Sequence, residues 1–217
     1  MIVIFDLDGT LIDSAPDIHA TANTVLAGEG LGDLDLPTVR SFIGRGVPHL
    51  VGRLLGAHGI EDAPRQARMV AEFGRHYDSA VNLTTVFPGV PQALAQLRAQ
   101  GHVLGICTNK PVSPARAILR HVGLLDHFAV LIGGDSCPER KPHPAPLLLA
   151  RSACGEGPVV YVGDSEVDAE CAAAAGLPLV LYTHGYRHAP AETLPHAALL
   201  DDFARLPEVL DALMPAS

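Results

Sequence analysis

A short apolar run near the start of the chain ends in two carboxylates, and this feature constrains the fold more than any other. Residues 2–5 are all apolar, and Asp6 and Asp8 follow one residue apart, before Gly9 and Thr10. Such a run predicts a buried strand of a parallel sheet. Open α/β sheets bind their ligands at the carboxyl ends of their strands, which is where these two carboxylates lie.

The same two carboxylates predict a bound cation. Side chains at positions i and i+2 of an extended segment point the same way. Two like charges held that close repel each other unless a proton or a cation neutralises them. Surface turns and calcium loops also use Asp-x-Asp-Gly. However, the sequence Thr10-Leu11-Ile12 interrupts the acidic series that a calcium loop needs, so a calcium loop is disfavoured.

Alternation of strands and helices predicts the fold class. Each predicted helix, at 91–100, 114–122 and 166–175, ends just before a glycine, a common helix stop signal. These helices lie between later members of a set of short apolar segments. The predicted strands are Ile2–Leu7, Val103–Thr108, Val130–Ile132, Val159–Gly163 and Leu179–Tyr182. We therefore expect an α/β fold, a parallel sheet with helices on both faces.

The segment between the first two strands breaks this alternation. Residues 14–87 contain helical patterns and no predicted strand, and they are too long for a simple crossover. Three apolar stripes follow helical spacing: Ile18, Ala22, Val25, Leu26; Val47, Leu50, Val51, Leu54, Leu55; and Met69, Val70, Phe73, Tyr77. We expect two domains, a core formed by residues 1–13 and 88–217 and a helical domain formed by residues 14–87.

Composition excludes several classes of partner. The chain has 217 residues, 48% of them hydrophobic, and a net charge of −9 without a basic run, so nucleic acid and anionic membranes are disfavoured partners. No segment approaches the ~20 apolar residues of a membrane span. The chain begins directly in a strand, and its four cysteines form no C-x-x-C pair. We therefore expect a cytoplasmic protein with reduced thiols.

Later strand ends carry further polar residues suited to phosphate chemistry. Thr108 ends the second strand, where a hydroxyl and turn amides suit a phosphate oxygen. Lys141 lies in a loop that prolines stiffen. Asp164 ends the fourth strand and could share a cation with Asp6, while Asp168, one helical turn later, could pair with Lys141. Taken singly, these residues also suit a turn, a solvated surface and a helix N-cap.

Together these elements resemble a known superfamily. The order Asp-x-Asp-Gly-Thr, strand-end Thr, Lys-Pro and Gly-Asp-x-x-x-Asp is similar to the four motifs of the haloacid dehalogenase (HAD) superfamily of phosphohydrolases, over essentially the whole chain. The resemblance implies a Rossmann-like core with strand order 5-4-1-2-3 and dependence on Mg²⁺. It also implies that the helical insert is a type-1 cap, which closes over the active site.

The resemblance assigns a role to each residue. Asp6 attacks phosphorus and forms an aspartyl-phosphate. Asp8 protonates the leaving alkoxide and later deprotonates the hydrolytic water; the dehalogenase branch lacks this acid. Lys141 and Mg²⁺ neutralise the phosphate charge. The implied metal ligands are Asp6, Asp164 and the Asp8 carbonyl, with Thr108 at the phosphate and Asp168, Gly9 and Thr10 in support.

Finer details are similar to bacterial phosphoglycolate phosphatases. These are the segment Leu11 to Asp17, which contains Asp-Ser-x-Pro-Asp, the sequence Thr108-Asn109-Lys110-Pro111, and the Gly-x-Gly loop within residues 42–46. Asn109 is a substrate-binding candidate, and Arg45, between two glycines, could reach the carboxylate of 2-phosphoglycolate. An exposed arginine in a plain turn explains Arg45 equally well.

Other activities share much of this pattern. Sugar-phosphate, pyrophosphate and N-acetylmuramate-6-phosphate phosphatases are alternatives. The β-phosphoglucomutase branch carries a cap histidine where this chain has Ile18; His19 is one residue away, about 100° around a helix. A catalytically inactive binding module is disfavoured because every key motif residue is present. We expect a small phosphorylated metabolite as the ligand and a monomer or homodimer as the assembly.

Overall fold

Six short apolar segments form one parallel sheet in the computed structural model, which describes residues 1–213. The strand order is β5-β4-β1-β6-β7-β8, with every neighbouring pair parallel. The strands are β1 (Ile2–Phe5), β4 (Val103–Cys107), β5 (Val130–Ile132), β6 (Val159–Gly163), β7 (Leu179–Tyr182) and β8 (Ala198–Leu200). Numbered as the five strands predicted from sequence and read from the β7 side, this order is 5-4-1-2-3, so the expected topology is confirmed.

The sequence did not predict β8, which extends the sheet beyond β7. It has only three residues and lies at the edge, where Leu199 is exposed. A strand this short, apolar throughout but buried on one side only, carries no alternation that could be recognised. The predicted strand at 2–7 ends at Phe5 and that at 103–108 ends at Cys107, so the polar residues follow the strands.

Helices cover both faces of the sheet because successive residues of β1 point to opposite sides. Val3 and Phe5 belong to one apolar cluster with the first set of helices, and Ile2 and Ile4 belong to another with the second set. The first set is α5 (Val90–Ala99), α6 (Val112–His121) and α9 (Leu206–Ala212); the second is α7 (Ala145–Cys154) and α8 (Glu166–Ala175). The expected α/β class, with helices on both faces, is thus confirmed. Short 3₁₀ turns lie at Leu125–His127, Ala191–Thr193 and Phe203–Arg205.

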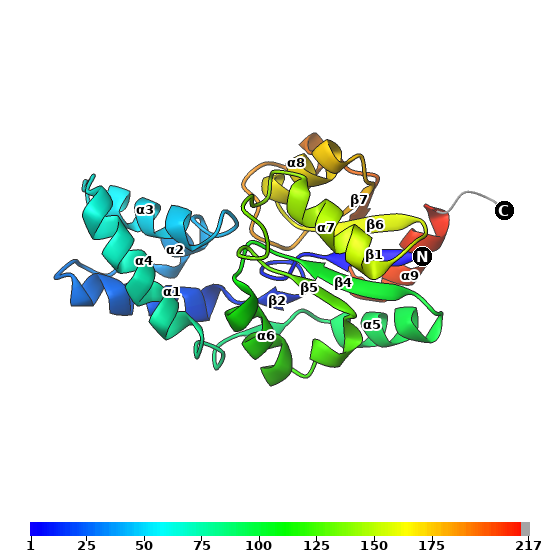
Figure 1. Ribbon diagram of the computed structural model, residues 1–217, viewed down its shortest axis with the longest axis horizontal. Coiled ribbons are helices and arrows are strands. Elements are labelled where there is room, and N and C mark those ends of the chain that lie inside the picture. The colour runs from blue at the N-terminus through cyan, green and yellow to red at the C-terminus, as the bar shows by residue number, and fades with distance from the viewer. Residues whose placement is uncertain (214–217) are drawn as a thin grey trace.

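Four helices form a separate part of the molecule, beyond one end of the sheet (Figure 1). They are α1 (Ala15–Gly28), α2 (Leu36–Arg40), α3 (Val47–Ala57) and α4 (Ala63–Tyr77). The three apolar stripes seen in the sequence meet in one hydrophobic cluster that contains only residues of this part. Asp35 and Asp62 cap α2 and α4 by accepting hydrogen bonds from the amides three residues later.

Two chain segments connect the helical part to the sheet, and they pair with each other. β2 (Ile12–Asp13) and β3 (Thr85–Val86) form a two-stranded antiparallel ribbon. The expectation that residues 14–87 contain no strand is therefore wrong at β3. A two-residue strand shows no periodicity and forms here because the outgoing and returning segments lie side by side. The division into 1–13 with 88–217 and 14–87 stays a proposal.

The strands β1, β4 and β6 all finish on the side of the sheet that faces the helical part (Figure 1). Polar side chains that follow these three strands are consequently gathered between the two parts of the molecule. Within residues 1–213, no helix is both long and apolar enough to cross a membrane.

Candidate active site

Three buried carboxylates form the centre of the site. Asp6 follows β1, Asp164 follows β6 and Asp168 lies in the first turn of α8; one oxygen of each lies within 4.8 Å of the others. All three are almost completely buried. So many negative charges in a buried space are unfavourable without cations. The cluster therefore has the composition of a divalent-cation site with oxygen ligands.

The unfavourable burial of negative charge is clearest at Asp6. Its Oδ1 is buried and, among residues 1–213, has no hydrogen-bond donor. Lys141 Nζ is 2.8 Å from this oxygen but is not aligned for a hydrogen bond, so the contact is an ion pair only. Burial, opposed by Lys141 and assisted by nearby Asp168, raises the pKa of Asp6 to about 7. A buried carboxylate oxygen without a hydrogen-bond donor fits a bound divalent cation.

Asp168 is held by protein donors on both oxygens. Its Oδ1 accepts hydrogen bonds from Lys141 Nζ at 2.7 Å and from the Tyr161 hydroxyl at 2.7 Å. Its Oδ2 accepts from the amides of Asp164 and Ser165 and from the Ser165 hydroxyl. Burial alone would raise the pKa of Asp168, but Lys141 and these donors lower it. Asp168 is thus an anchor for Lys141 and for the start of α8.

Asp164 is held in a tight pocket of main chain. Its Oδ1 accepts a hydrogen bond from Thr10 Oγ1 at 2.8 Å and its Oδ2 accepts from the Tyr186 amide at 2.6 Å. A Cβ on Gly9 or Gly185 would lie 2.6 Å or 2.1 Å from the Asp164 carboxylate. Only glycine fits at these two positions, and Gly9 also has a φ of +89°. Burial raises the pKa of Asp164 well above its usual range.

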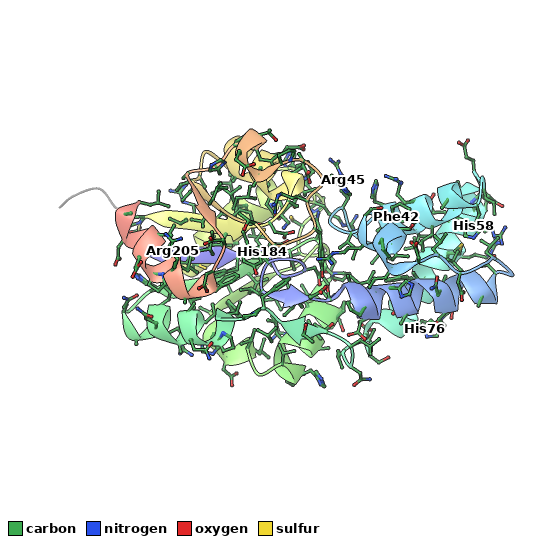
Figure 2. All side chains as sticks on the ribbon, turned by 180° about the vertical axis from the view of Figure 1, so that it is seen from behind. Phe42, Arg45, His58, His76, His184 and Arg205 are labelled. Carbon is green, nitrogen blue, oxygen red and sulfur yellow. The ribbon has the colours of Figure 1, made fainter. Side chains whose placement is uncertain are left out.

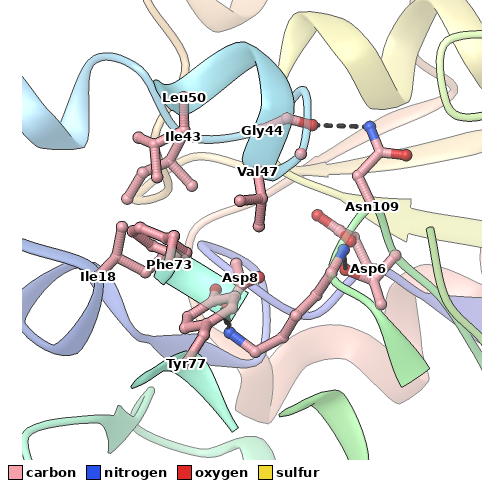
Figure 3. Close-up of a pocket in the computed structure, with 13 residues that line it drawn as sticks. Asp6, Asp8, Ile18, Ile43, Gly44, Val47, Leu50, Phe73, Tyr77 and Asn109 are labelled. Carbon is pink, nitrogen blue, oxygen red and sulfur yellow. Dashed lines mark hydrogen bonds and ion pairs between the residues drawn. The ribbon is translucent and has the colours of Figure 1, made fainter. Parts of the chain in front are cut away.

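Asn109 fixes the loop that carries Lys141. Its side-chain oxygen accepts a hydrogen bond from the Lys141 amide, and its side-chain nitrogen donates to the Lys141 carbonyl. The same nitrogen donates to the carbonyl of Gly44, which belongs to the helical part (Figure 3). The Asn109 amide is therefore occupied by protein partners, two on the core loop and one on the loop before α3.

The surroundings of Lys141 keep its ammonium group charged. Burial would lower the pKa of Lys141, but Asp168 and Asp6 outweigh it and raise that pKa well above its usual value.

Asp8 faces the helical part and is contacted by two donors. Ser14 Oγ donates to Asp8 Oδ1 at 2.5 Å and Lys110 Nζ donates to the same oxygen at 3.2 Å. Lys110 Nζ also donates to the Tyr77 hydroxyl and lies 4.0 Å from the centre of the Tyr77 ring. Tyr77 is the last residue of α4. Lys110 thus joins the core to the helical part beside Asp8.

A cavity of about 40 Å³ lies between these groups and the helical part (Figure 3). Its core wall is polar and its opposite wall is mostly apolar. The core supplies Asp6, Asp8, Thr108, Asn109 and Lys110, and the helical part supplies Ile18, Ile43, Gly44, Gly46, Val47, Leu50, Phe73 and Tyr77. Thr108 is buried, and its hydroxyl accepts a hydrogen bond from the Lys110 amide.

Arg45 does not line this cavity, although the glycines on both sides of it do. Its side chain is exposed at the junction between the two parts (Figure 2) and lines a neighbouring cavity with His49 and Arg53. The substrate-binding role of Arg45 stays a prediction. His19 bonds the carbonyl of Leu34 inside the helical part, whereas Ile18 lines the cavity.

Sequence reasoning did not assign roles to three residues that the structure brings into the site. Lys110 stands in the sequence only as part of a motif, although its place two residues after a strand-end threonine is a signal for a role in the site. Tyr161 donates to Asp168 from within an apolar strand, where it looks like a core residue. Tyr186 lies in a loop without a local signal, yet its amide binds Asp164.

Comparison with known proteins gives a consistent picture. Residues 1–176 match the family of haloacid dehalogenase-like hydrolases. The chain is 51% identical over 214 residues to a phosphoglycolate phosphatase of Cereibacter sphaeroides, covering 98% of each chain. It is 41% identical to the phosphoglycolate phosphatase of Rhodospirillum rubrum, covering 94% of this chain and 88% of the other.

Solved structures show the same architecture. The crystal structure of a predicted phosphoglycolate phosphatase from Haemophilus somnus superposes with a TM-score of 0.89 at 32% identity. The superposition covers 96% of this chain and 97% of the other, so it includes the helical part as well as the sheet.

Proposed function

Since the chain belongs to the haloacid dehalogenase-like hydrolases, we propose that it is a Mg²⁺-dependent phosphatase that hydrolyses 2-phosphoglycolate to glycolate and phosphate through an aspartyl-phosphate. One observation carries the proposal: Asp6, Asp164 and Lys141 meet at one buried point, and Asp8 stands beside them at a cavity. The choice of substrate is supported by relatives that are named phosphoglycolate phosphatase and that match almost the whole chain.

The proposed metal site uses oxygen ligands from two strand ends. Asp6, Asp164 and the main-chain carbonyl of Asp8 would hold Mg²⁺, and substrate and water oxygens would complete the octahedron that this ion prefers. When bound, the ion supplies positive charge against the phosphate dianion and the carboxylate cluster. Asp168 is not assigned as a ligand because two protein donors occupy its Oδ1 and three occupy its Oδ2. Each oxygen of Asp164 accepts only one hydrogen bond from the described residues, which leaves a lone pair for the ion.

The proposed chemistry then follows from the residues. The carboxylate of Asp6 attacks phosphorus, a P–O bond forms, and the bond to the leaving oxygen breaks as Asp8 donates its proton to that oxygen. In the second half, Asp8 takes a proton from water as the water oxygen attacks phosphorus, which releases phosphate and restores Asp6. Lys141 opposes the charge on the transferring phosphoryl group, and the Thr108 hydroxyl donates to one of its oxygens.

Lys110 is our candidate for recognising the leaving group. It is the one cationic side chain among the described residues that line the cavity, and the helical part offers mostly apolar groups there. The carboxylate of 2-phosphoglycolate would need a cation within such surroundings. Lys110 reaches both Asp8 and Tyr77, so it lies next to the oxygen that leaves.

Alternative reactions fit less well. A mutase would need an acid–base histidine in the cavity, but Ile18 lines the cavity and His19 bonds Leu34 outside it. Sugar-phosphate and other phosphatase substrates remain rivals to 2-phosphoglycolate, since the phosphate site does not distinguish leaving groups. We further propose a cytoplasmic enzyme, monomeric or homodimeric, whose ligand is a small phosphorylated metabolite rather than nucleic acid or a membrane, in line with the acidic chain.

The test compares two substrates and the roles of two cationic side chains, Lys110 and Arg45. Wild type, Lys110→Met and Arg45→Gln are assayed with 2-phosphoglycolate and with ethyl phosphate, whose leaving group is uncharged. We expect Lys110→Met to lower the ratio of the two kcat/KM values at least tenfold, as losing a charge-assisted hydrogen bond of ~1.5–3 kcal/mol would. Arg45→Gln, whose side chain lies outside the cavity, is expected to change that ratio less than about threefold.

Three outcomes would contradict parts of this assignment. A collapse of the ratio only in Arg45→Gln would transfer recognition to Arg45. Equal losses on both esters in Lys110→Met would mean that Lys110 only positions Asp8. Activity that survives EDTA, or no turnover of 2-phosphoglycolate by wild type, would refute the metal or the substrate, respectively.

A further inference from the structure

The chain enters the helical part at Asp13-Ser14-Ala15, and one tyrosine from a distant loop holds this segment. Tyr186 accepts hydrogen bonds from the amides of Ser14, at 2.8 Å, and Ala15, at 3.0 Å, through its hydroxyl. The same hydroxyl donates to Asp13 Oδ1 at 2.7 Å. A phenol offers one donor and two acceptor positions, so all are used. Tyr186 is buried, and within the segment the Ala15 amide also donates to Asp13 Oδ1 at 3.3 Å.

The other side of Tyr186 touches the catalytic loops. Its amide donates to Asp164 Oδ2 at 2.6 Å. Its ring packs so close to Gly9 that a Cβ there would lie 2.9 Å from the ring. The guanidinium of Arg40, at the end of α2, lies 4.7 Å from the centre of the same ring. One residue therefore contacts the helical part, the connecting segment and two loops of the site.

Ser14 continues the connection to Asp8. Its amide donates to Tyr186, while its hydroxyl donates to Asp8 Oδ1. Lys110 donates to that same oxygen. Two donors on Oδ1 fix the rotation of the Asp8 carboxyl group. Its Oδ2, which has no hydrogen-bond partner in the described part of the chain, is left to carry the proton for the leaving group.

We propose that Tyr186 is a positioning residue for catalysis, which orients Asp8 through Ser14 only when the helical part is closed over the core. Opening would turn the 13–15 segment, because this segment is one of the two connections to the helical part. The Ser14 hydroxyl would then leave Asp8, so Asp8 would be correctly oriented only in the closed state. The inference rests on the proposed phosphatase activity but not on which phosphate ester is the substrate.

The test is a double-mutant cycle on turnover. Tyr186→Phe removes the hydroxyl alone, Ser14→Ala removes the link to Asp8, and the double variant removes both. We expect each single variant to lower kcat about tenfold at saturating substrate. We expect the kcat of the double variant to lie within about twofold of that of the less active single variant. Tyr182→Phe is the matched control: it lacks the same atom, but in the described residues no hydrogen bond involves that hydroxyl, so we expect kcat within about twofold of wild type.

Multiplicative losses in the double variant, or a kcat for Tyr186→Phe equal to that of Tyr182→Phe, would overturn the proposal. A merely structural role would lower the melting temperature without this non-additivity in kcat. Deuterium uptake by peptides covering residues 8–15 gives a readout without substrate: we expect faster uptake in Tyr186→Phe only, and unchanged uptake would also overturn the proposal. If wild type hydrolyses no phosphate ester, the proposed function and the catalytic role of Tyr186 both fail, while the exchange measurement still decides whether Tyr186 holds the 13–15 segment.

Discussion

Replacing Asp168 with asparagine tests whether the buried ion pair with Lys141 holds the site together. Asp168 accepts five hydrogen bonds, two on Oδ1 and three on Oδ2. An asparagine has the same shape, but whichever way its amide points, its NH₂ group faces protein donors. The Lys141 ammonium would keep only Asp6 as an ionic partner. Breaking a buried ion pair in this way costs ~3–5 kcal/mol.

Urea unfolding at pH 7 measures this loss. A loss of ~4 kcal/mol is a large part of a typical total of ~5–15 kcal/mol. With a slope of ~2 kcal/mol per molar urea, it would lower the midpoint by roughly 2 M. Glu166→Gln is the matched control: the same chemical change two residues earlier in α8, at a half-buried side chain that binds two amides. We expect it to cost at most ~1 kcal/mol. A midpoint for Asp168→Asn equal to that of Glu166→Gln would refute the reasoning.

Two further predictions concern the nucleophile and the thiols. Asp6→Asn keeps the shape but removes the charge that attacks phosphorus, so phosphatase assays should show a loss of several orders of magnitude in kcat with an unchanged circular dichroism spectrum; turnover near wild type would exclude the covalent route. Burial raises the pKa of Cys171 to about 11, so little of it is thiolate at pH 8 and it should resist a disulfide reagent in the native state. Cys137, which is partly exposed, should react first; equal labelling rates, measured by mass spectrometry of tryptic peptides, would contradict this.

The sequence determined those features that depend on neighbouring residues. Apolar runs fixed the strands of the sheet except β8, and the helical stripes formed the separate cluster of the helical part, because burial selects residues by their spacing. The polar residues at 6, 108 and 164 lie at one edge of the sheet, because parallel strands end together there. The motif order was sufficient to identify the family for the same reason: each motif is a strand end with a few residues after it.

Only the tertiary structure decided how the two parts of the chain meet. The bond between Lys110 and Tyr77 joins the loop after β4 to the end of α4, and that between Ser14 and Tyr186 joins residues 172 positions apart. No local pattern encodes such pairs, since the packing of the helices against the sheet brings them together. Arg45, although flanked by two glycines that line the cavity, projects outside it for the same reason: the direction of a loop side chain depends on how α3 is placed over the core.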